Sequence, residues 1–434
     1  MEGPAAVSQQ AGVEAERAAA GGSAGSSPRA DSAASSPQTD TSPGDAGRAR
    51  MPDMTYSEQE TELRSAVRSV LDDRAGFNDV LARTETAETY DRGLWRTLAA
   101  EVGCAGLLIP ESYGGAGGSF REAAVVAEEI GRSVAPVPFL GSAVLATVAL
   151  LSASADRTAG DHTAQLLTDL AAGRATAALA VPFASMPGAR IGRTVRIGPA
   201  VDRDAEGTYR LSGSVQGVAD GLLADVLIIP ADGVPFGLFA VRADDPGVTR
   251  TPVLSLDMTR QLCDLRLDNA QGERIAQGSR ADDAIATALQ AGAAMLAAEQ
   301  LGLADRALEI TLAYVKQRYQ FARPIGSFQA LKHRLADWWV AVTQARAASR
   351  YAAACLAEGS PDTAVAVALA KAACSDSAVH ASQEMIQLHG GIGFTWEHPA
   401  HLFLKRAKST SMALGSADRH RATLARLADL PAAD

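Results

Sequence analysis

The longest helical pattern in the chain covers residues 284–321, AIATALQAGAAMLAAEQLGLADRALEITLAYVKQRYQF. Its apolar side carries, at helical spacing, Leu296, Leu303, Leu308, Leu312 and Val315. Three further helical stretches follow, over residues 328–358, 362–390 and 399–430. Four long amphipathic helices with short connections predict an antiparallel four-helix bundle over residues 282–430. Apolar positions on more than one side of such helices also indicate contacts between subunits.

The middle of the chain, residues 176–275, has a different periodicity. Short apolar and β-branched runs alternate there with Gly, Pro and Asp, roughly every 8–15 residues, which is typical of strands joined by turns. We expect strands over residues 177–181, 194–197, 209–212, 226–230, 237–241 and 261–267. This pattern predicts a small antiparallel β-barrel or sandwich, of which we expect the barrel.

Two further segments precede this β domain. Residues 54–175 carry apolar residues at helical spacing and predict an N-terminal α-helical domain. Residues 1–53 form a tail, and its first 50 residues contain no Leu, Ile or aromatic residue, so we expect the tail to be disordered. It lacks the apolar core of a signal peptide, and its acidic residues argue against a transit peptide. We expect a dispensable leader, or a true start at Met51 or Met54. The predicted fold class is α+β and multidomain, with helical, β and helical parts in chain order.

The composition argues against several classes of function. The chain has 434 residues, is 47% hydrophobic and carries a net charge of −10, whereas a nucleic-acid-binding surface needs clustered Lys and Arg. No apolar run is long enough to span a membrane. The four cysteines form no CxxC pair, so we expect reduced, buried thiols in a cytoplasmic protein. The HxxH pair His398 and His401 lacks a further ligand at a telling distance, and we expect no metal site.

Three local motifs, combined with this layout, carry a resemblance to a known family. They are GLLIPESYGGAG at residues 106–117, YVKQRYQFARPIGSFQ at residues 314–329 and QLHGGIGF at residues 387–394. The helical, β, helical order and these motifs resemble the acyl-CoA dehydrogenase family of flavoproteins, over about residues 55–430. The second and third motifs are fairly specific in combination, whereas GGxGF alone would be weak.

The resemblance implies a cofactor, a reaction and partners. Members of the family bind FAD across a dimer interface, and a carboxylate base removes the α-proton of an acyl-CoA thioester while a hydride passes to the flavin. An electron-transfer flavoprotein is the electron acceptor that the resemblance implies. By position, Arg318 resembles the arginine that pairs with the FAD pyrophosphate of a neighbouring subunit, and Phe321 the ring packed near the cofactor. Gln387 and Gly391 resemble contacts to its adenosine–pyrophosphate end. Without the family, Arg318 could be a surface ion-pair residue and Gly391 part of a helix cap.

The sequence departs from the family at the catalytic base. Leu414 stands where many members carry the base Glu, and Gly292 stands where a second branch carries it. Glu299 lies two helical turns beyond Gly292 and is a weak candidate for a substitute, because it is displaced by about 10 Å along the axis. A polar contact between helices is the interpretation of Glu299 that we favour. The flavin-facing loop and strand of the family are replaced here by residues 181–188 and 218–221.

Three functions remain open. The chain could be an active acyl-CoA dehydrogenase with a base elsewhere. It could be a base-deficient subunit of a heteromer, in which a partner supplies the carboxylate and the contacts to the flavin ring. It could also be a non-redox binding or scaffold protein built on the same fold. The loss of one end of the site and the retention of the other favour the subunit.

Overall fold

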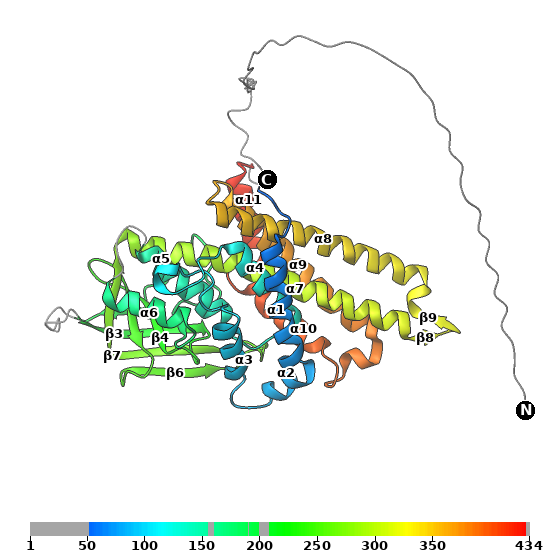
Figure 1. Ribbon diagram of the computed structural model, residues 1–434, viewed down its shortest axis with the longest axis horizontal. Helices are drawn as coiled ribbons and strands as arrows, with labels where there is room; N and C mark the ends of the chain where they lie inside the picture. The colour runs from blue at the N-terminus through cyan, green and yellow to red at the C-terminus, as the bar shows by residue number, and fades with distance from the viewer. Residues whose placement is uncertain (1–51, 155–159, 190, 199–207, 431–434) are drawn as a thin grey trace, which may run out of the picture. The chain divides into compact units, whose positions relative to one another are not determined.

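The computed structural model describes residues 52–154, 160–189, 191–198 and 208–430. The chain divides into two units, residues 1–50 and residues 51–434. The first unit, and with it most of the predicted disordered tail, lies outside the described residues. The second unit contains helices, then a sheet, then long helices (Figure 1), so the predicted fold class is confirmed.

The N-terminal part of the second unit is helical. Its α-helices are α1 (Glu58–Arg74), α2 (Phe77–Thr84), α3 (Arg92–Arg96), α4 (Phe120–Ser133), α5 (Thr147–Ser154) and α6 (Asp161–Ala171). Two π-helical segments, η1 (Thr97–Glu101) and η3 (Phe139–Ala146), and the 3₁₀ turn η2 (Glu111–Tyr113) complete it. Helices α1 and α4 each begin with a capping box, in which Ser57 pairs with Glu60 and Ser119 with Glu122. These caps satisfy the free N–H groups at the two helix starts.

The middle of the chain forms a seven-stranded sheet. The strands are β1 (Ala177–Leu179), β2 (Val195–Ile197), β3 (Thr208–Ala219), β4 (Val226–Ala231), β5 (Gly237–Arg242), β6 (Val248–Val253) and β7 (Leu262–Gln277). They are ordered β1-β4-β5-β7-β3-β2, and β6 also pairs with β7; among these described strand pairs, β1–β4 is parallel and the others are antiparallel. Backbone bridges from Arg196 to Asp232 and from Pro182 to Val218 bring strands far apart in this order into contact. The sheet therefore curls back on itself, in the manner expected of a small barrel.

The C-terminal part consists of long helices. Helix α7 (Ser279–Gln317) leads into the hairpin β8 (Tyr319–Gln320) and β9 (Arg323–Pro324), which is followed by the 3₁₀ turn η5 (Ile325–Ser327) and α8 (Gln329–Glu358). Then come α9 (Thr363–His389), the 3₁₀ turn η6 (Gly390–Phe394), α10 (Ala400–Met412) and α11 (Ala417–Leu427). The single helix expected over residues 399–430 is thus two helices, because Leu414 and Gly415 adopt positive φ angles of 52° and 97° and no α-helix continues through such a turn. In Figure 1 the β8–β9 hairpin lies at the end of α7 remote from the sheet.

Close packing fixes helix α4 against helix α7. A Cβ added to Gly131 of α4 would overlap the carbonyl oxygen of Glu299, and one added to Gly302 of α7 would overlap that of Glu128. Each helix thus presents a glycine to the backbone of the other. Any side chain here would separate the two helices.

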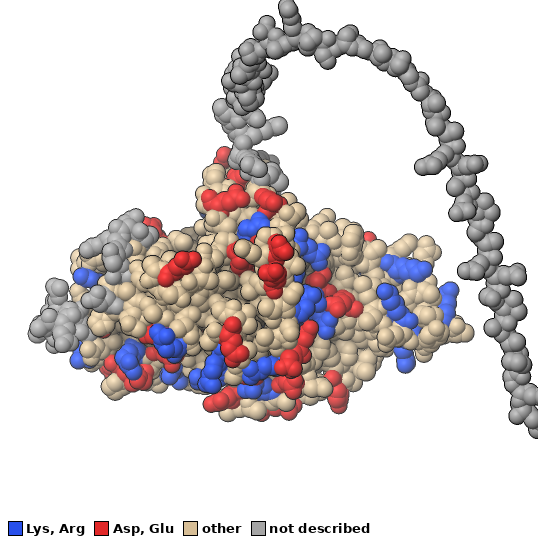
Figure 2. Space-filling model, in the orientation of Figure 1, with Lys and Arg blue, Asp and Glu red and all other residues tan. Residues whose placement is uncertain are grey.

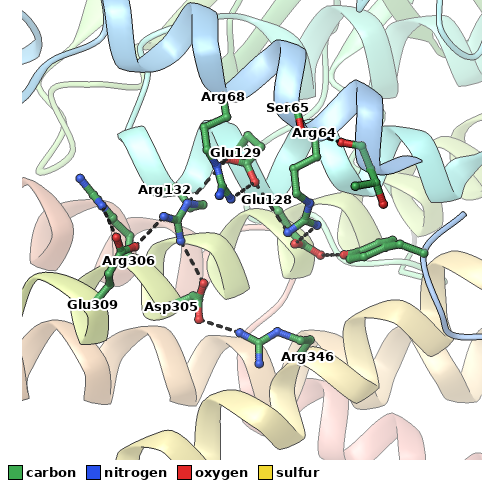
Figure 3. Close-up of polar contacts among 12 residues, drawn as sticks. Arg64, Ser65, Arg68, Glu128, Glu129, Arg132, Asp305, Arg306, Glu309 and Arg346 are labelled. Atoms are coloured by element: carbon green, nitrogen blue, oxygen red, sulfur yellow. Dashed lines mark hydrogen bonds and ion pairs between the residues drawn. The ribbon is translucent and has the colours of Figure 1, made fainter. Parts of the chain in front are cut away.

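Ion pairs join the same helices to α1 and α8 (Figure 3). Arg132 of α4 pairs with Asp305 of α7 at 2.9 Å, and Asp305 also accepts from Arg346 of α8 at 2.6 Å. The buried Glu129 of α4 pairs with Arg68 of α1 at 2.7 Å. The N-terminal helices and the C-terminal bundle are therefore linked by charge as well as by apolar packing. One apolar core runs through both groups of helices and a second fills the inside of the sheet.

Within the described residues, no helix combines the length and the apolar character that crossing a membrane requires. All four cysteines are buried and free, as the sequence predicts.

Candidate functional site

The end of helix α7 carries Arg318 and Phe321 on an exposed hairpin. Arg318 follows α7 directly, and its backbone N–H donates to the carbonyl of Tyr314 at 2.9 Å. Its side chain is exposed and has no hydrogen bond or ion pair with the rest of the described chain. Phe321 and Ala322 have positive φ angles of 53° and 61° at the hairpin turn, and the Phe321 ring is 86% exposed. An arginine and an aromatic ring are thus presented together to whatever binds at this end.

The end of helix α9 carries Gln387 and Gly391. Gln387 is exposed in the last turn of the helix, and its carbonyl accepts from the N–H of Gly390. Gly390 has φ +62°, which a glycine adopts without strain. No atom lies within 4 Å of the position that a Cβ on Gly391 would take. The backbone at Gly391 is therefore open to close approach by a ligand.

The ends of α7 and α9 lie side by side. Tyr314 of α7 stacks on His389 of α9, with ring centroids 4.3 Å apart. Arg318 comes one turn after Tyr314, and Gln387 comes two residues before His389. The structure therefore brings Arg318, Phe321, Gln387 and Gly391 to the same end of the bundle.

The surface around these residues is both basic and apolar. In Figure 2, Lys and Arg side chains gather at the end of the bundle where the β8–β9 hairpin lies. Exposed basic residues in this part of the chain include Lys316, Arg318, Arg323 and Lys332. The exposed apolar residues are Tyr319, Phe321, Ile392, Phe394 and Trp396. We call these nine residues the bundle-end surface. A positive, aromatic surface suits a ligand that carries phosphates and a ring system.

The two expected base positions lie next to each other elsewhere in the fold. A Cβ added to Gly292 would stand 3.2 Å from Cδ1 of Leu414 and would overlap the side chain of Leu145. Leu414 is fully buried, and Gly292 and Leu145 are buried as well. Three apolar residues therefore fill the place where the resemblance puts the carboxylate.

The segments that replace the family's flavin-facing elements close onto this place. The N–H of Leu414 donates to the carbonyl of Phe183 at 2.8 Å, and the N–H of Phe183 donates to Gly217 at 2.9 Å. A Cβ on Gly415 would be 2.8 Å from Cβ of Met186. The segment of residues 181–188 is thus bound to the turn between α10 and α11.

Asp220 is another buried group in this region. Its carboxylate accepts from the hydroxyl of Tyr90 and, at 2.9 Å, from the N–H of Gly141. Burial raises the pKa of Asp220, although Arg260 nearby opposes this. Both oxygens of the carboxylate therefore accept hydrogen bonds from other groups of the protein.

Glu299 is buried in an ion-pair network. One carboxylate oxygen accepts from Arg260 at 2.7 Å and the other from Arg406 at 2.8 Å. Burial raises the pKa of Glu299, but the two guanidinium groups outweigh burial, so the pKa is lowered. Arg406 also bonds to Asp257 and to Thr259. With both oxygens engaged, Glu299 holds α7, α10 and the β6–β7 loop together, which is the structural interpretation favoured from the sequence.

Lys371 was not singled out by the sequence. This α9 residue is fully buried, and its Nζ donates to Ser375 Oγ at 2.9 Å and to the carbonyls of Thr410 and Gly415 at 3.1 and 3.3 Å. It therefore holds the α10–α11 turn that carries Leu414. The sequence contains one indication of this role, because Lys371 is a single charged residue on an apolar helix face that also carries Val367, Cys374 and Ala378.

The HxxH histidines are occupied by local contacts. His401 Nε2 lies 3.0 Å from the carbonyl of Trp396, and His398 accepts from the N–H of Ala400 at 3.3 Å. Among the described residues, no three His, Cys, Asp or Glu side chains are grouped as ligands for a metal ion.

Comparison with known proteins agrees with this architecture. Residues 57–174 match the family profile for the acyl-CoA dehydrogenase N-terminal domain, and residues 283–428 match that for the C-terminal domain. Acyl-CoA dehydrogenase IpdE2 of Mycobacterium tuberculosis is 38% identical over 363 residues, which cover 84% of this chain and 95% of that protein.

Solved structures show the same similarity. The ChsE4-ChsE5 complex of Mycobacterium tuberculosis contains a chain that is 29% identical, with a TM-score of 0.75, and the match covers 88% of this chain and all of the other. A variant of the Tcur3481-Tcur3483 steroid ACAD is 30% identical, with a TM-score of 0.73, over 86% of this chain and 98% of the other. The chain therefore belongs to the acyl-CoA dehydrogenase family of FAD-dependent oxidoreductases.

Proposed function

We propose that this chain is the base-deficient subunit of a heteromeric acyl-CoA dehydrogenase. In that assembly Arg318, Phe321, Gln387 and Gly391 bind the adenosine–pyrophosphate end of FAD, and a partner subunit supplies the carboxylate base and the contacts to the flavin ring. One contrast carries the proposal. The cofactor residues are exposed at the bundle end, whereas the two base positions are apolar, buried and in contact with each other.

The chemistry of the two ends supports this division. When bound, FAD accepts the hydride from the acyl thioester. The planar guanidinium of Arg318 can form two hydrogen bonds to a diphosphate, and Gly391 lets the cofactor approach the backbone. At the other end Leu414 and Gly292 offer no group that can remove a proton. The residues present therefore fit the pyrophosphate end of the cofactor but not its reacting end.

The length of α7 supports a site divided between subunits. Gly292 and Arg318 are 26 residues apart along one continuous helix, a rise of about 39 Å. This is longer than an extended FAD molecule. Arg318 is therefore suited to serve a flavin ring held by another subunit, and not one beside Gly292 of its own chain.

The relatives also support a heteromer. Two of the similar structures are named for pairs of chains, ChsE4-ChsE5 and Tcur3481-Tcur3483. By resemblance, we further propose that the assembly works in the cytoplasm on an acyl-CoA and passes its electrons to an electron-transfer flavoprotein.

Two other functions make different predictions for flavin. A self-sufficient enzyme requires a base within this chain, and Glu299 has both oxygens engaged by arginines. A non-redox scaffold would retain no flavin in any assembly. The flavin content of the lone chain and of the two-chain complex therefore distinguishes the heteromer subunit, the self-sufficient enzyme and the scaffold.

The deciding experiment measures FAD per chain by flavin absorbance. The chain is purified alone and after coproduction with a family member that carries the base Glu. We expect little flavin in the lone chain, and flavin with dehydrogenase activity in the two-chain complex. One FAD per lone chain together with dehydrogenase activity would contradict the proposal, and absence of flavin from a stable two-chain complex would favour the scaffold.

Arg318→Ala tests the half-site itself. Loss of a charge-assisted contact to the pyrophosphate costs about 1.5–3 kcal/mol, so FAD affinity of the complex is expected to fall by about 10- to 150-fold. Arg96→Ala, which removes an exposed arginine of helix α3, is the matched control and should leave FAD affinity unchanged. Equal flavin affinity in the Arg318 variant and the control would remove Arg318 from the site.

A further inference from the structure

The contact between Tyr314 and His389 joins the last turns of α7 and α9. Their rings are stacked, with an angle of 27° between the ring planes and 4.3 Å between centroids. The Tyr314 hydroxyl also donates to the backbone carbonyl of His389 at 3.3 Å. A ring contact and a hydrogen bond thus connect the same two residues.

His389 is itself fixed on several sides. It is buried, its Nδ1 donates to the carbonyl of Met385 at 2.7 Å, and its ring lies 4.4 Å from the ring of His398. Tyr314 therefore packs against an imidazole that the end of α9 and the segment just before α10 hold in place. An imidazole held by these two neighbours is a rigid support for the tyrosine ring.

Each residue of this contact is linked through the backbone to a residue of the proposed cofactor site. The carbonyl of Tyr314 accepts from the N–H of Arg318 at 2.9 Å, which sets where the chain leaves α7. His389 immediately precedes the turn at Gly390 and Gly391. A shift between Tyr314 and His389 would therefore change the separation of Arg318 from Gly391.

We propose that Tyr314 and His389 form a clamp of positioning residues that sets Arg318 against Gln387 and Gly391, so that one FAD pyrophosphate can contact both helix ends at once. The inference rests on the proposed function. Helix ends are the parts of a helix that open most easily, and two groups that bind one ligand gain affinity only when they are held at the correct separation. The clamp supplies that separation, without touching the cofactor.

The experiment compares FAD dissociation constants in whichever form retains FAD, the lone chain or the two-chain complex. Tyr314→Leu removes the stack and the hydroxyl, and we expect FAD affinity to fall by about 3- to 10-fold, the range of a stacked ring pair. Tyr314→Phe keeps the ring and should restore most of the affinity. Tyr351→Leu is the matched control, because Tyr351 is a partly buried tyrosine of α8 that hydrogen-bonds to Asp362, far along the chain from the cofactor residues.

A double-mutant cycle with Arg318→Ala shows whether Tyr314 acts through Arg318. The clamp requires that Tyr314→Leu have little further effect once Arg318 is removed. A full additional loss in that background would indicate general damage and would overturn the clamp. If Tyr314→Leu does not fold, His389→Leu removes the same contact from α9 and takes its place in the cycle.

The outcomes separate the clamp from the proposed function. If Arg318→Ala weakens FAD binding and Tyr314→Leu does not, the clamp is wrong and the half-site stands. If Arg318→Ala has no effect, the half-site fails, and the clamp fails with it.

Discussion

Leu414 combines a strained backbone with a fully buried side chain. Its φ of 52° is unfavourable for a leucine by about 1–2 kcal/mol, and its side chain packs against Gly292 and Leu145. A fully buried leucine excludes water and substrate from this position, and its side chain has no group that can transfer a proton. The sequence shows that the carboxylate is absent, but not that leucines fill its place.

Restoring the carboxylate is therefore expected to damage the protein. Leu414→Glu buries a carboxyl group with no described partner, and we expect it to destabilise folding by about 2–5 kcal/mol without creating dehydrogenase activity. Leu414→Met conserves volume and should cost less than about 1.5 kcal/mol. Urea denaturation of both variants measures the difference, and acyl-CoA oxidation by a well-folded Leu414→Glu protein would show that substrate does reach this place.

Lys371 makes stability depend on pH in the alkaline range. Burial lowers its pKa from 10.5 to about 7. Between these values the unfolded chain binds more protons than the native chain, so stability rises with pH. The rise contributed by this one group approaches about 1.4 kcal/mol per pH unit.

Lys371→Met should remove that contribution. We expect the free energy of unfolding of the wild type to increase from pH 7 to pH 9 relative to that of the variant, because only the wild type loses a buried charge. Lys332→Met, at an exposed lysine, serves as the control. Parallel pH profiles for the wild type and the Lys371 variant would mean that Lys371 stays charged in the native protein.

Elements with a regular period are those that the sequence predicts well. Helices α7, α8 and α9 begin and end within a few residues of their expected limits, because long apolar stripes define them. The sequence does not predict strand β6 (Val248–Val253), because its alternation is weak and all six of its residues are exposed or half-exposed where they pair with β7. The break between α10 and α11 was missed for another reason. It depends on Lys371 and Phe183, which bind the turn from distant parts of the chain.

The crossing of α4 and α7 gives a prediction at the scale of elements. Gly302→Ala places a methyl group against the carbonyl of Glu128, and we expect it to destabilise the protein by about 1–3 kcal/mol in spite of the better helix propensity of alanine. Gly391→Ala, where the Cβ would meet no atom within 4 Å, is the matched control. Chemical denaturation followed by circular dichroism compares them, and equal stability would show that α4 can move away without cost.

At the scale of the whole molecule, α7 connects two regions with different surroundings. Near Gly292 the fold is closed by apolar contacts, and at Arg318 it presents charge and aromatic rings to the outside. Family motifs predict the second region, because its residues are local to two short segments. The closure of the first region depends on Leu145, Phe183 and Leu414. These residues belong to no common motif, and the first and last of them are more than 200 residues apart in the sequence.

The exposure of the bundle-end surface has a consequence for how the cell must make this chain. Phe321 and Phe394 are 86% and 78% exposed, and aromatic rings clustered in this way attract other proteins as well as the intended one. In the heteromer proposed above, a chain synthesised in excess of its partner would keep this surface uncovered and would be a substrate for chaperones and proteases. For that proposed heteromer, balanced synthesis of the two subunits would be a condition for the yield of active complex, independent of the affinity of either subunit for flavin.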